Sequence, residues 1–122
     1  MDIQFPIILI GDGDLIKYKT LEDAELDLEA YSLELYSVYD SNCRKVKLYK
    51  KNKYNHVGFI LEDEISLCQE LKQKIQEYGL YYELTKFTSD DIIKLLESIP
   101  YYEISLNPIS QRINTLWKRL TS

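Results

Sequence analysis

Apolar blocks and turn signals alternate in the N-terminal part of the chain. Residues 5–10 form an almost continuous apolar run of strand length, and the Gly-Asp-Gly-Asp sequence at 11–14 carries the Asp-Gly signal of a tight turn. Residues 15–18 then return as a second apolar strand. This pattern predicts an N-terminal β-hairpin.

A short acidic helix is predicted directly after the hairpin. Thr20 is a favourable N-cap, and Asp23 follows three residues later in a variant of the capping box. Apolar residues recur at spacings of three and four, which indicates one buried stripe on a helix of about three turns. The stripe consists of Leu21, Ala24, Leu28 and Tyr31, and the other side carries Glu22, Asp23, Asp27 and Glu29. We expect the stripe to pack on the sheet and the acids to face solvent.

More strands follow the acidic helix. Residues 35–39 alternate and are rich in β-formers, residues 40–43 are typical of a turn, and residues 44–49 form a basic alternating strand. After a polar loop at 52–55, residues 56–61 are a further β-rich run that would extend the sheet beside 44–49. These runs predict a second hairpin and a larger sheet.

A long helix is predicted next. The acids at 62–64 would open it, and it would end near Tyr78, with Gly79 in the C′ position. Its expected apolar stripe is Ile65, Cys68, Leu71 or Lys72, Ile75 and Tyr78. Residues 80–84 fit either an edge strand or a loop.

Two further helices complete the predicted chain. Thr88 or Ser89 is expected to cap the first, which runs through Ser98 and stops at Pro100. Its buried residues would be Ile92, Leu95, Leu96 and Ile99. The Asn107-Pro108 pair is a favourable N-cap and first position for the last helix.

These elements predict one α+β domain over residues 1–122. An N-terminal hairpin, an acidic helix and a second hairpin form a mainly antiparallel sheet, with about three further helices in the C-terminal half. The chain has 122 residues, of which 45% are hydrophobic and 29% charged, as is ordinary for a globular domain. One compact core is therefore expected.

The sequence favours a cytoplasmic protein. The N-terminus has Asp2 where a secretory leader would have basic residues, and no run of eighteen apolar residues is long enough to span a membrane. The two cysteines, Cys43 in a turn and Cys68 on a helix, suggest no disulfide framework. We expect no membrane association.

The first fifty residues resemble a known group of proteins. The residues that carry the resemblance are Y-K-T-L-E-D-A-E-L-D-L-E at 18–29 and Y-S-V-Y-D-S-N-C-R-K-V-K-L at 36–48. The chain is similar there to small bacterial proteins that include immunity proteins of polymorphic and contact-dependent toxin systems. The resemblance implies an inhibitor that binds a cognate toxin, with no catalytic residues to carry over.

Charge is unevenly distributed along the chain. Residues 1–40 hold ten acids and two bases, whereas residues 41–61 hold six bases and no acid. The acidic parts disfavour nucleic acid and suit a basic protein partner, because complementary fields speed association. The alternative is an acidic surface that serves only solubility. The candidate partner-binding residues are Asp12, Asp14, Glu22, Asp23, Asp27, Glu29, Tyr36 and Tyr39.

Eleven tyrosines and a basic segment leave further alternatives open. Tyrosine is enriched at interfaces, but half-buried sheet faces also favour it. The bases at 44–53, beside Tyr49 and Tyr54, could follow a phosphate backbone or contact an acidic patch of a partner. They could also guard a strand edge or match acidic charges within the chain.

The residues give little indication of catalysis. His56 is the only histidine, so a Cys-His pair would have to combine it with Cys43, which has no helix N-terminus to activate it. Asp12 and Asp14 fit a turn better than a calcium loop, because Ile16 and Lys17 stand where a ligand and a glycine are needed. We expect that the protein is not an enzyme and that it binds no cofactor or metal. The alternative to a toxin inhibitor is a small structural or regulatory protein that self-associates.

Overall fold

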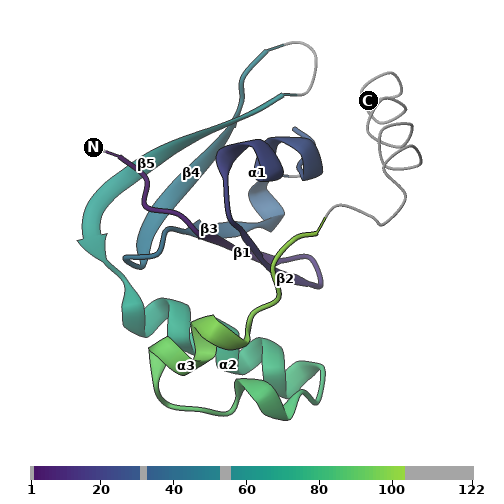
Figure 1. The fold of residues 1–122 in the computed structure, drawn as a ribbon, viewed down its shortest axis with the longest axis vertical. Coiled ribbons are helices and arrows are strands. Elements are labelled where there is room, and N and C mark those ends of the chain that lie inside the picture. The colour runs from purple at the N-terminus through teal and green to yellow at the C-terminus, as the bar shows by residue number, and fades with distance from the viewer. Residues whose placement is uncertain (1, 31–32, 53–55, 104–122) are drawn as a thin grey trace.

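The structure is a computed structural model that describes residues 2–30, 33–52 and 56–103. Five strands form one antiparallel sheet in the order β2-β1-β3-β4-β5 (Figure 1). The strands are β1 (Ile7–Gly11), β2 (Asp14–Tyr18), β3 (Ser37–Tyr39), β4 (Arg44–Lys50) and β5 (Val57–Ser66). The helices are α1 (Leu21–Asp27), α2 (Cys68–Tyr81) and α3 (Ile92–Ser98), with short 3-10 turns at Leu33–Leu35 and Thr85–Phe87. The predicted α+β class is confirmed.

Strand β1 lies at the centre of the packing and is buried on both faces. Ile8 and Ile10 point into a cluster with α2 and α3, whereas Ile7 and Leu9 point into a second cluster with α1. Successive side chains of a strand alternate between the faces of a sheet, so a strand covered on both sides must be apolar throughout. This explains the unbroken apolar run at 5–10.

The β1–β2 turn forms as predicted. Gly11, Asp12 and Gly13 have φ angles of 144°, 49° and 84°, which are conformations that glycine and aspartate accept more readily than most residues. A Cβ atom on Gly11 would also overlap the carbonyl oxygen of Leu35. The turn therefore depends on its glycines both for backbone conformation and for space.

Helix α1 is correctly placed but shorter than expected. The Thr20 hydroxyl accepts a hydrogen bond from the backbone N–H of Asp23 at 3.2 Å, so the predicted N-cap is confirmed. The helix ends at Asp27, because Leu28 adopts an extended conformation and packs in the α1-side cluster as the chain turns towards β3. Leu21 is 41% exposed and only Ala24 of the helix is fully buried. Tyr31 lies outside the described residues.

The boundary between β5 and α2 differs from the prediction. The acids at 62–64 belong to β5, and α2 begins only at Cys68. The β4–β5 ladder is irregular here but resumes where Arg44 pairs with Ser66, which keeps the chain extended past the acids. Ile65 is consequently 61% exposed and is not part of a helical stripe. Acidic residues such as those at 62–64 suit both the first turn of a helix and an exposed strand, so they do not distinguish the two.

Gly79 does not end α2. The helix continues to Tyr81, and Gly79 is buried inside it against Phe87. A Cβ atom at Gly79 would lie 2.7 Å from the Cβ of Phe87, closer than packed carbon atoms approach. The glycine thus permits close packing of the 3-10 turn on the helix. Residues 80–84 are the last helical turn and the loop that follows it, so the strand alternative is wrong.

The cap of α3 is Asp91, not Thr88 or Ser89. The Asp91 side chain accepts a hydrogen bond from the N–H of Ile93 at 3.0 Å, and the Ser89 hydroxyl accepts one from the N–H of Asp91. Leu95 and Ile99 are buried as expected, and the helix ends before Pro100. The helix predicted from Asn107 and most of the 52–55 loop lie outside the described residues.

The segment after α3 covers one edge of the sheet. The N–H of Lys17 donates to the carbonyl of Pro100 at 2.9 Å, and the N–H of Tyr102 donates to the carbonyl of Lys17 at 2.8 Å. This single parallel bridge shields β2 along part of its length. At the other side of the sheet, β5 is the outermost strand of the part of the chain that the structure describes.

Candidate functional site

An acidic cavity lies between the β1–β2 hairpin and the end of α1. Its volume is about 520 Å³ and it opens to solvent. Five of the eight candidate partner-binding residues line it, although they come from three separate parts of the chain. The lining residues are Leu9, Asp12, Asp14, Ile16, Tyr18, Asp27, Leu28, Glu29, Tyr36 and Tyr102. We call this site the acidic cavity.

Local structure explains how the carboxylates converge. Asp12 lies in the hairpin turn and Asp14 opens β2, so the tight turn keeps both at one end of the hairpin. Asp27 is the last residue of α1, and Glu29 follows in the extended segment that leads away from the helix. Because α1 packs over the hairpin, its C-terminal end brings these two acids to the same place.

Two tyrosines line the acidic cavity, Tyr18 on β2 and Tyr102 in the segment after α3. The Tyr18 hydroxyl donates a hydrogen bond of 2.6 Å to Oδ2 of Asp27, and the Tyr18 ring lies 5.7 Å from the ring of Tyr102. Neither tyrosine was identified from the sequence. Tyr18 lies two residues after Ile16 on β2, and side chains two residues apart on a strand lie on the same face. The alternation of this strand would therefore have placed both on the face that lines the cavity.

The carboxylates of the acidic cavity disfavour one another's charge. Burial raises the pKa of Asp14, and the negative charges of Asp27 and Asp12 raise it further. Burial likewise raises the pKa of Tyr36, with Asp14 and Asp12 adding to the effect. A cation placed in this cavity would relieve the repulsion, so the arrangement favours a positively charged ligand.

Three carboxylates of the acidic cavity have no ion pair with a described basic residue. Over residues 2–30, 33–52 and 56–103, no lysine or arginine forms an ion pair with Asp12, Asp14 or Asp27. The same part of the chain contains no group of histidine, cysteine, aspartate and glutamate side chains with the geometry to hold a metal ion. An organic cation fits the arrangement better than a metal does.

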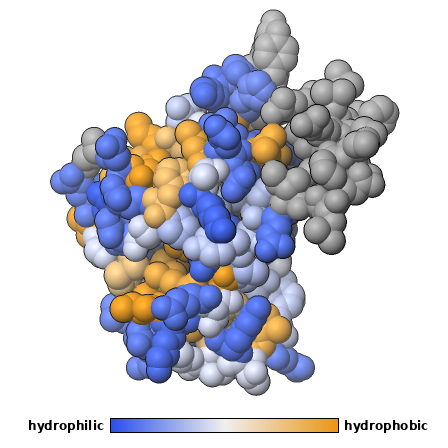
Figure 2. All heavy atoms as spheres, in the orientation of Figure 1, coloured by the Kyte–Doolittle hydropathy of each residue, from blue (hydrophilic) through white to orange (hydrophobic). Residues whose placement is uncertain are grey.

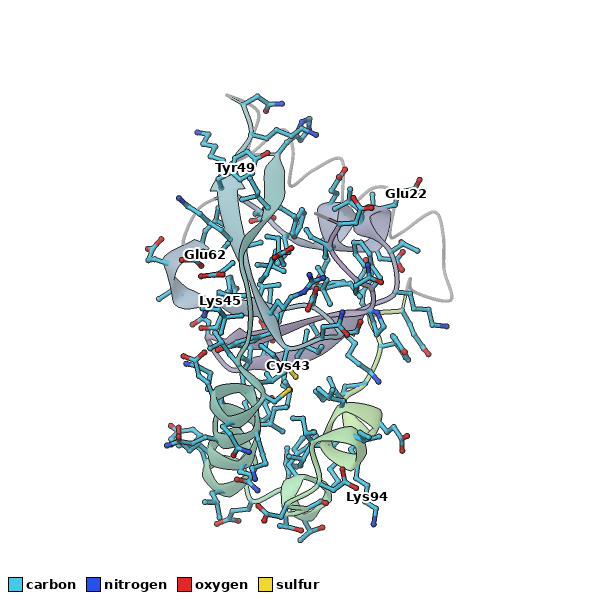
Figure 3. The ribbon with its side chains drawn as sticks, turned by 90° about the vertical axis from the view of Figure 1, so that its left-hand side faces the viewer. Glu22, Cys43, Lys45, Tyr49, Glu62 and Lys94 are labelled. Carbon is cyan, nitrogen blue, oxygen red and sulfur yellow. The ribbon has the colours of Figure 1, made fainter. Side chains whose placement is uncertain are left out.

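The other three candidate residues lie elsewhere. Glu22 is exposed on the first turn of α1 (Figure 3), and Asp23 is partly buried beside the N-cap; neither lines the cavity. Tyr39 is 0% exposed, and its hydroxyl donates to Oε2 of Glu70 at 3.0 Å. Its assignment to a contact surface is therefore corrected, because β3 turns this ring into the core beneath α2.

Asp40 is a buried carboxylate with a structural role. Burial alone would raise its pKa, but hydrogen bonds from the Arg44 side chain and from the backbone N–H groups of Arg44, Gln4 and Asn42 lower it overall. The closest contact, from Nη2 of Arg44, is 2.7 Å. These bonds fix the β3–β4 turn and attach the N-terminal segment to it.

Cys43 and His56 do not meet. Cys43 precedes β4 at the end where Arg44 pairs with Ser66, whereas His56 precedes β5 at the end where Lys50 pairs with Val57. The two ends of this ladder are about 20 Å apart, given the rise of about 3.3 Å per strand residue. A Cys-His nucleophile is therefore excluded for this pair.

The basic strand β4 is not an edge. It lies between β3 and β5, so its lysines do not guard an exposed strand edge, and that alternative is wrong. The ammonium of Lys45 lies 4.7 Å from the centre of the Tyr39 ring. The outermost strand, β5, carries acids at 62–64 instead.

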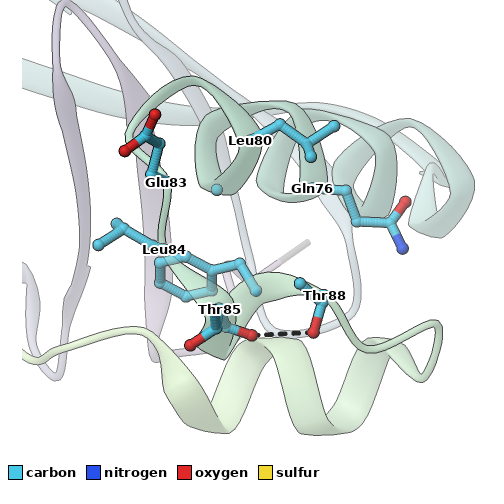
Figure 4. A pocket seen from close by; sticks show the side chains of 8 residues that line it. Gln76, Leu80, Glu83, Leu84, Thr85 and Thr88 are labelled. Atoms are coloured by element: carbon cyan, nitrogen blue, oxygen red, sulfur yellow. Dashed lines mark hydrogen bonds between the residues drawn. The ribbon is translucent and has the colours of Figure 1, made fainter.

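A second, apolar cavity lies where α2 meets the following 3-10 turn (Figure 4). Its volume is about 500 Å³, and Leu80, Leu84 and Phe87 supply much of its apolar lining. Thr88 lies at its rim with its hydroxyl donating to the carbonyl of Thr85 at 2.8 Å. Leu80 and Tyr81 beside it are 77% and 80% exposed. This end of α2 offers an apolar contact surface without an evident reactive group.

Comparison with known proteins finds no family model that matches the chain, and no similar curated protein or solved structure. In the described residues, no helix combines the length and the apolar character needed to cross a bilayer.

Proposed function

We propose that this chain is a binding protein that takes a basic side chain of another protein into the acidic cavity, and that its biological role is that of a bacterial immunity protein which neutralises a cognate toxin. The observation that carries the proposal is the convergence of Asp12, Asp14, Asp27 and Glu29 on one open cavity. The resemblance of residues 18–48 to immunity proteins supplies the toxin as partner.

The lining of the acidic cavity suits lysine or arginine. The apolar side chains of Leu9, Ile16 and Leu28 can receive an aliphatic stem, while the carboxylates receive the charged head. A volume of about 520 Å³ lies within the usual range of ligand sites. An inhibitor that buries a basic residue of a toxin would mask the surface around that residue without any chemical step.

The charge distribution of the chain supports the same proposal. Outside the cavity, Glu22 and Asp23 extend the negative field over α1. Such fields raise the rate at which oppositely charged proteins meet, and salt screens the effect. Glu22 and Asp23 therefore contribute to association rate, while the cavity residues hold the bound partner.

The proposal is tested by co-expression with the protein encoded beside this chain. We expect rescue of growth by the unaltered chain and loss of rescue by the Asp14→Asn/Asp27→Asn double variant. The matched control is Asp63→Asn/Glu64→Gln, which removes the same charge from β5. Equal rescue by both double variants would refute the acidic cavity as the binding site, and a neighbour that is harmless on its own would refute the immunity role.

The exposed end of α2 supports the alternative function, self-association. Leu80, Tyr81 and Tyr82 are exposed beside the apolar cavity, and exposed apolar patches commonly mark protein interfaces. On the face drawn in Figure 2, however, hydrophobic residues are interspersed with hydrophilic ones. A sedimentation experiment on the unaltered chain and on Leu80→Glu separates the two functions. A dimer that is lost in the variant supports self-association. If the unaltered chain is still a monomer at about 100 µM, a stable dimer is excluded.

A further inference from the structure

The two cysteines of the chain lie together where the sheet meets α2. Cys43 follows the β3–β4 turn and is 3% exposed, and Cys68 is the first residue of α2 and is partly exposed. The side chain of Cys68 is close enough to that of Cys43 to contribute, after burial, to the raised pKa of the Cys43 thiol. Figure 3 shows the two sulfur atoms next to each other at the Cys43 label.

Backbone contacts hold the two cysteines in this position. Arg44 pairs with Ser66 at the end of the β4–β5 ladder, and the N–H of Leu67 donates to the carbonyl of Cys43 at 2.8 Å. The Ser66 hydroxyl also donates to the carbonyl of Asn42 at 3.0 Å. Cys43 and both of its neighbours are thus bonded to the two residues that precede Cys68, which leaves the thiols little freedom to separate. Residues bridged by a disulfide have Cα atoms about 5–6 Å apart, and Cys68 directly follows Leu67, whose N–H contacts the Cys43 carbonyl.

The two thiols differ in accessibility. Burial raises the pKa of Cys43 to about 12, so it remains a neutral thiol at neutral pH. Cys68 packs at the margin of the same core and has the Ser66 hydroxyl 3.2 Å from its sulfur. An oxidant in solution therefore reaches Cys68 first, and Cys43 is the nearest thiol that can react afterwards.

We propose that Cys43 and Cys68 are a redox modification site that closes to a reversible disulfide, with a peroxide as the oxidant. The Cys68 thiolate attacks one peroxide oxygen, the O–O bond breaks, and hydroxide leaves as Cys68 becomes a sulfenic acid. The Cys43 sulfur then attacks the Cys68 sulfur, and water leaves with the Cys43 proton. In total, two thiols and hydrogen peroxide give a disulfide and two waters, and a dithiol reductant reverses the bond by exchange.

The bond would join the β3–β4 turn to the first residue of α2. It would enclose the whole β4–β5 hairpin, from Cys43 to Cys68, in a covalent loop. Cross-linking a loop of this length restricts the unfolded chain more than the folded one, because the native contacts already hold the ends together. Oxidation should therefore stabilise the fold without rearranging it.

Intact-mass analysis of the full chain after treatment with hydrogen peroxide tests the proposal. We expect the mass to fall by about 2 Da, for two hydrogens lost, and to recover with dithiothreitol. Digestion should yield one peptide pair that joins Cys43 to Cys68. The melting temperature of the oxidised form should rise by about 10 °C.

Single variants provide the controls. Cys68→Ser, a partly exposed position, should abolish the mass loss while leaving the fold intact by circular dichroism. Cys43→Ala should instead allow Cys68 to accumulate added oxygen, at about 16 Da for each atom. If the unaltered chain gains oxygen on Cys68 or forms intermolecular dimers in place of the internal cross-link, the proposal is overturned.

Discussion

Tyr18 and Asp27 are joined by a hydrogen bond of 2.6 Å that connects strand β2 to the last residue of α1. Both residues line the acidic cavity, and their contact attaches the short helix to the sheet. A helix of seven residues has little stability of its own, so tertiary contacts of this kind must hold it in place.

Removing the Tyr18 hydroxyl should destabilise the fold. For Tyr18→Phe we expect the free energy of unfolding to fall by about 1–2 kcal/mol, because the Asp27 carboxylate loses the hydrogen bond that the Tyr18 hydroxyl donates to it. Chemical denaturation monitored by fluorescence measures the change. Tyr36→Phe is the matched control: it lines the same cavity, and its hydroxyl makes no hydrogen bond to the described residues, so its stability should match that of the unaltered chain.

The same contact predicts a dependence on alkaline pH. Burial, followed by the hydrogen bond to Asp27, raises the pKa of Tyr18 above that of the unfolded chain. The stabilisation is therefore complete below about pH 10, the ordinary pKa of tyrosine, and is lost as the pH rises beyond it. Denaturation curves between neutral pH and pH 11 should show a steeper loss for the unaltered chain than for Tyr18→Phe. Parallel losses would contradict the assignment.

Asp40 and Arg44 form a pair whose separation should be costly. Asp40→Asn removes a fully buried negative charge and leaves the Arg44 guanidinium without it, so we expect a loss of about 3 kcal/mol. Because the pKa of Asp40 is lowered on folding, its stabilisation is present above about pH 4 and disappears as the pH falls through the folded-state pKa. Urea denaturation from pH 7 to pH 3 measures both effects. Asp90→Asn, at the exposed pair with Lys72, should leave stability unchanged.

Gly79→Ala separates the packing role of this glycine from its predicted role as a helix terminator. Alanine normally favours a helix interior by about 1 kcal/mol, but here its Cβ would meet Phe87 at 2.7 Å. We expect the clash to prevail and the variant to lose about 1–3 kcal/mol in thermal or chemical unfolding. Phe87→Leu keeps the Cβ atom that makes this contact, so Gly79→Ala should cost about as much in the Phe87→Leu background as in the unaltered chain. A stabilised Gly79→Ala would show that α2 and the 3-10 turn move apart at little cost.

The acidic cavity should carry a measurable electrostatic penalty. Since the pKa of Asp14 is raised on folding, its ionised form opposes folding above its unfolded-state pKa of about 4. Asp14→Asn should therefore stabilise the isolated chain at pH 7, by less than about 1 kcal/mol because solvent screens the site. A carboxyl-detected NMR titration should also show the pKa of Asp14 falling in Asp27→Asn. If Asp14 titrates at the same pH in both proteins, the two carboxylates do not interact.

The sequence predicts the sheet well because its strands obey local rules. The Asp-Gly turn, the Thr20 cap and the basic run at 44–49 each specify a conformation through nearby residues, and all three form. Acids at 62–64 were assigned to a helix because a first turn and an exposed strand favour the same residues. Gly79 was misassigned because its requirement comes from Phe87, which only the tertiary fold brings close.

Five of the residues that line the acidic cavity are candidates from the sequence, whereas its shape and its other lining residues are not. Charge alone grouped Asp12, Asp14, Asp27 and Glu29, whereas Glu22 and Asp23 share the helix without sharing the cavity. Tyr39 shows the limit of composition as a guide, since a tyrosine that bonds Glu70 in the core has the same sequence signature as one at an interface. The pairing of Cys43 with Cys68 depends on the β4–β5 register, which no local pattern encodes.

The bridge between Lys17 and the segment at 100–102 makes the two edges of the sheet unequal: β2 is partly covered, so it is less able to pair with a further strand. A strand from another molecule could pair with β2 only after displacing the backbone hydrogen bonds of Lys17. Strand addition is therefore easier beside β5. Strand β5 carries Glu62, Asp63 and Glu64. If two copies paired antiparallel through β5, these negative side chains would face one another, and their repulsion would disfavour fibre formation. The two outer strands of the sheet therefore differ, because native backbone bonds cover part of β2, whereas acidic side chains on β5 disfavour pairing between two copies of the chain.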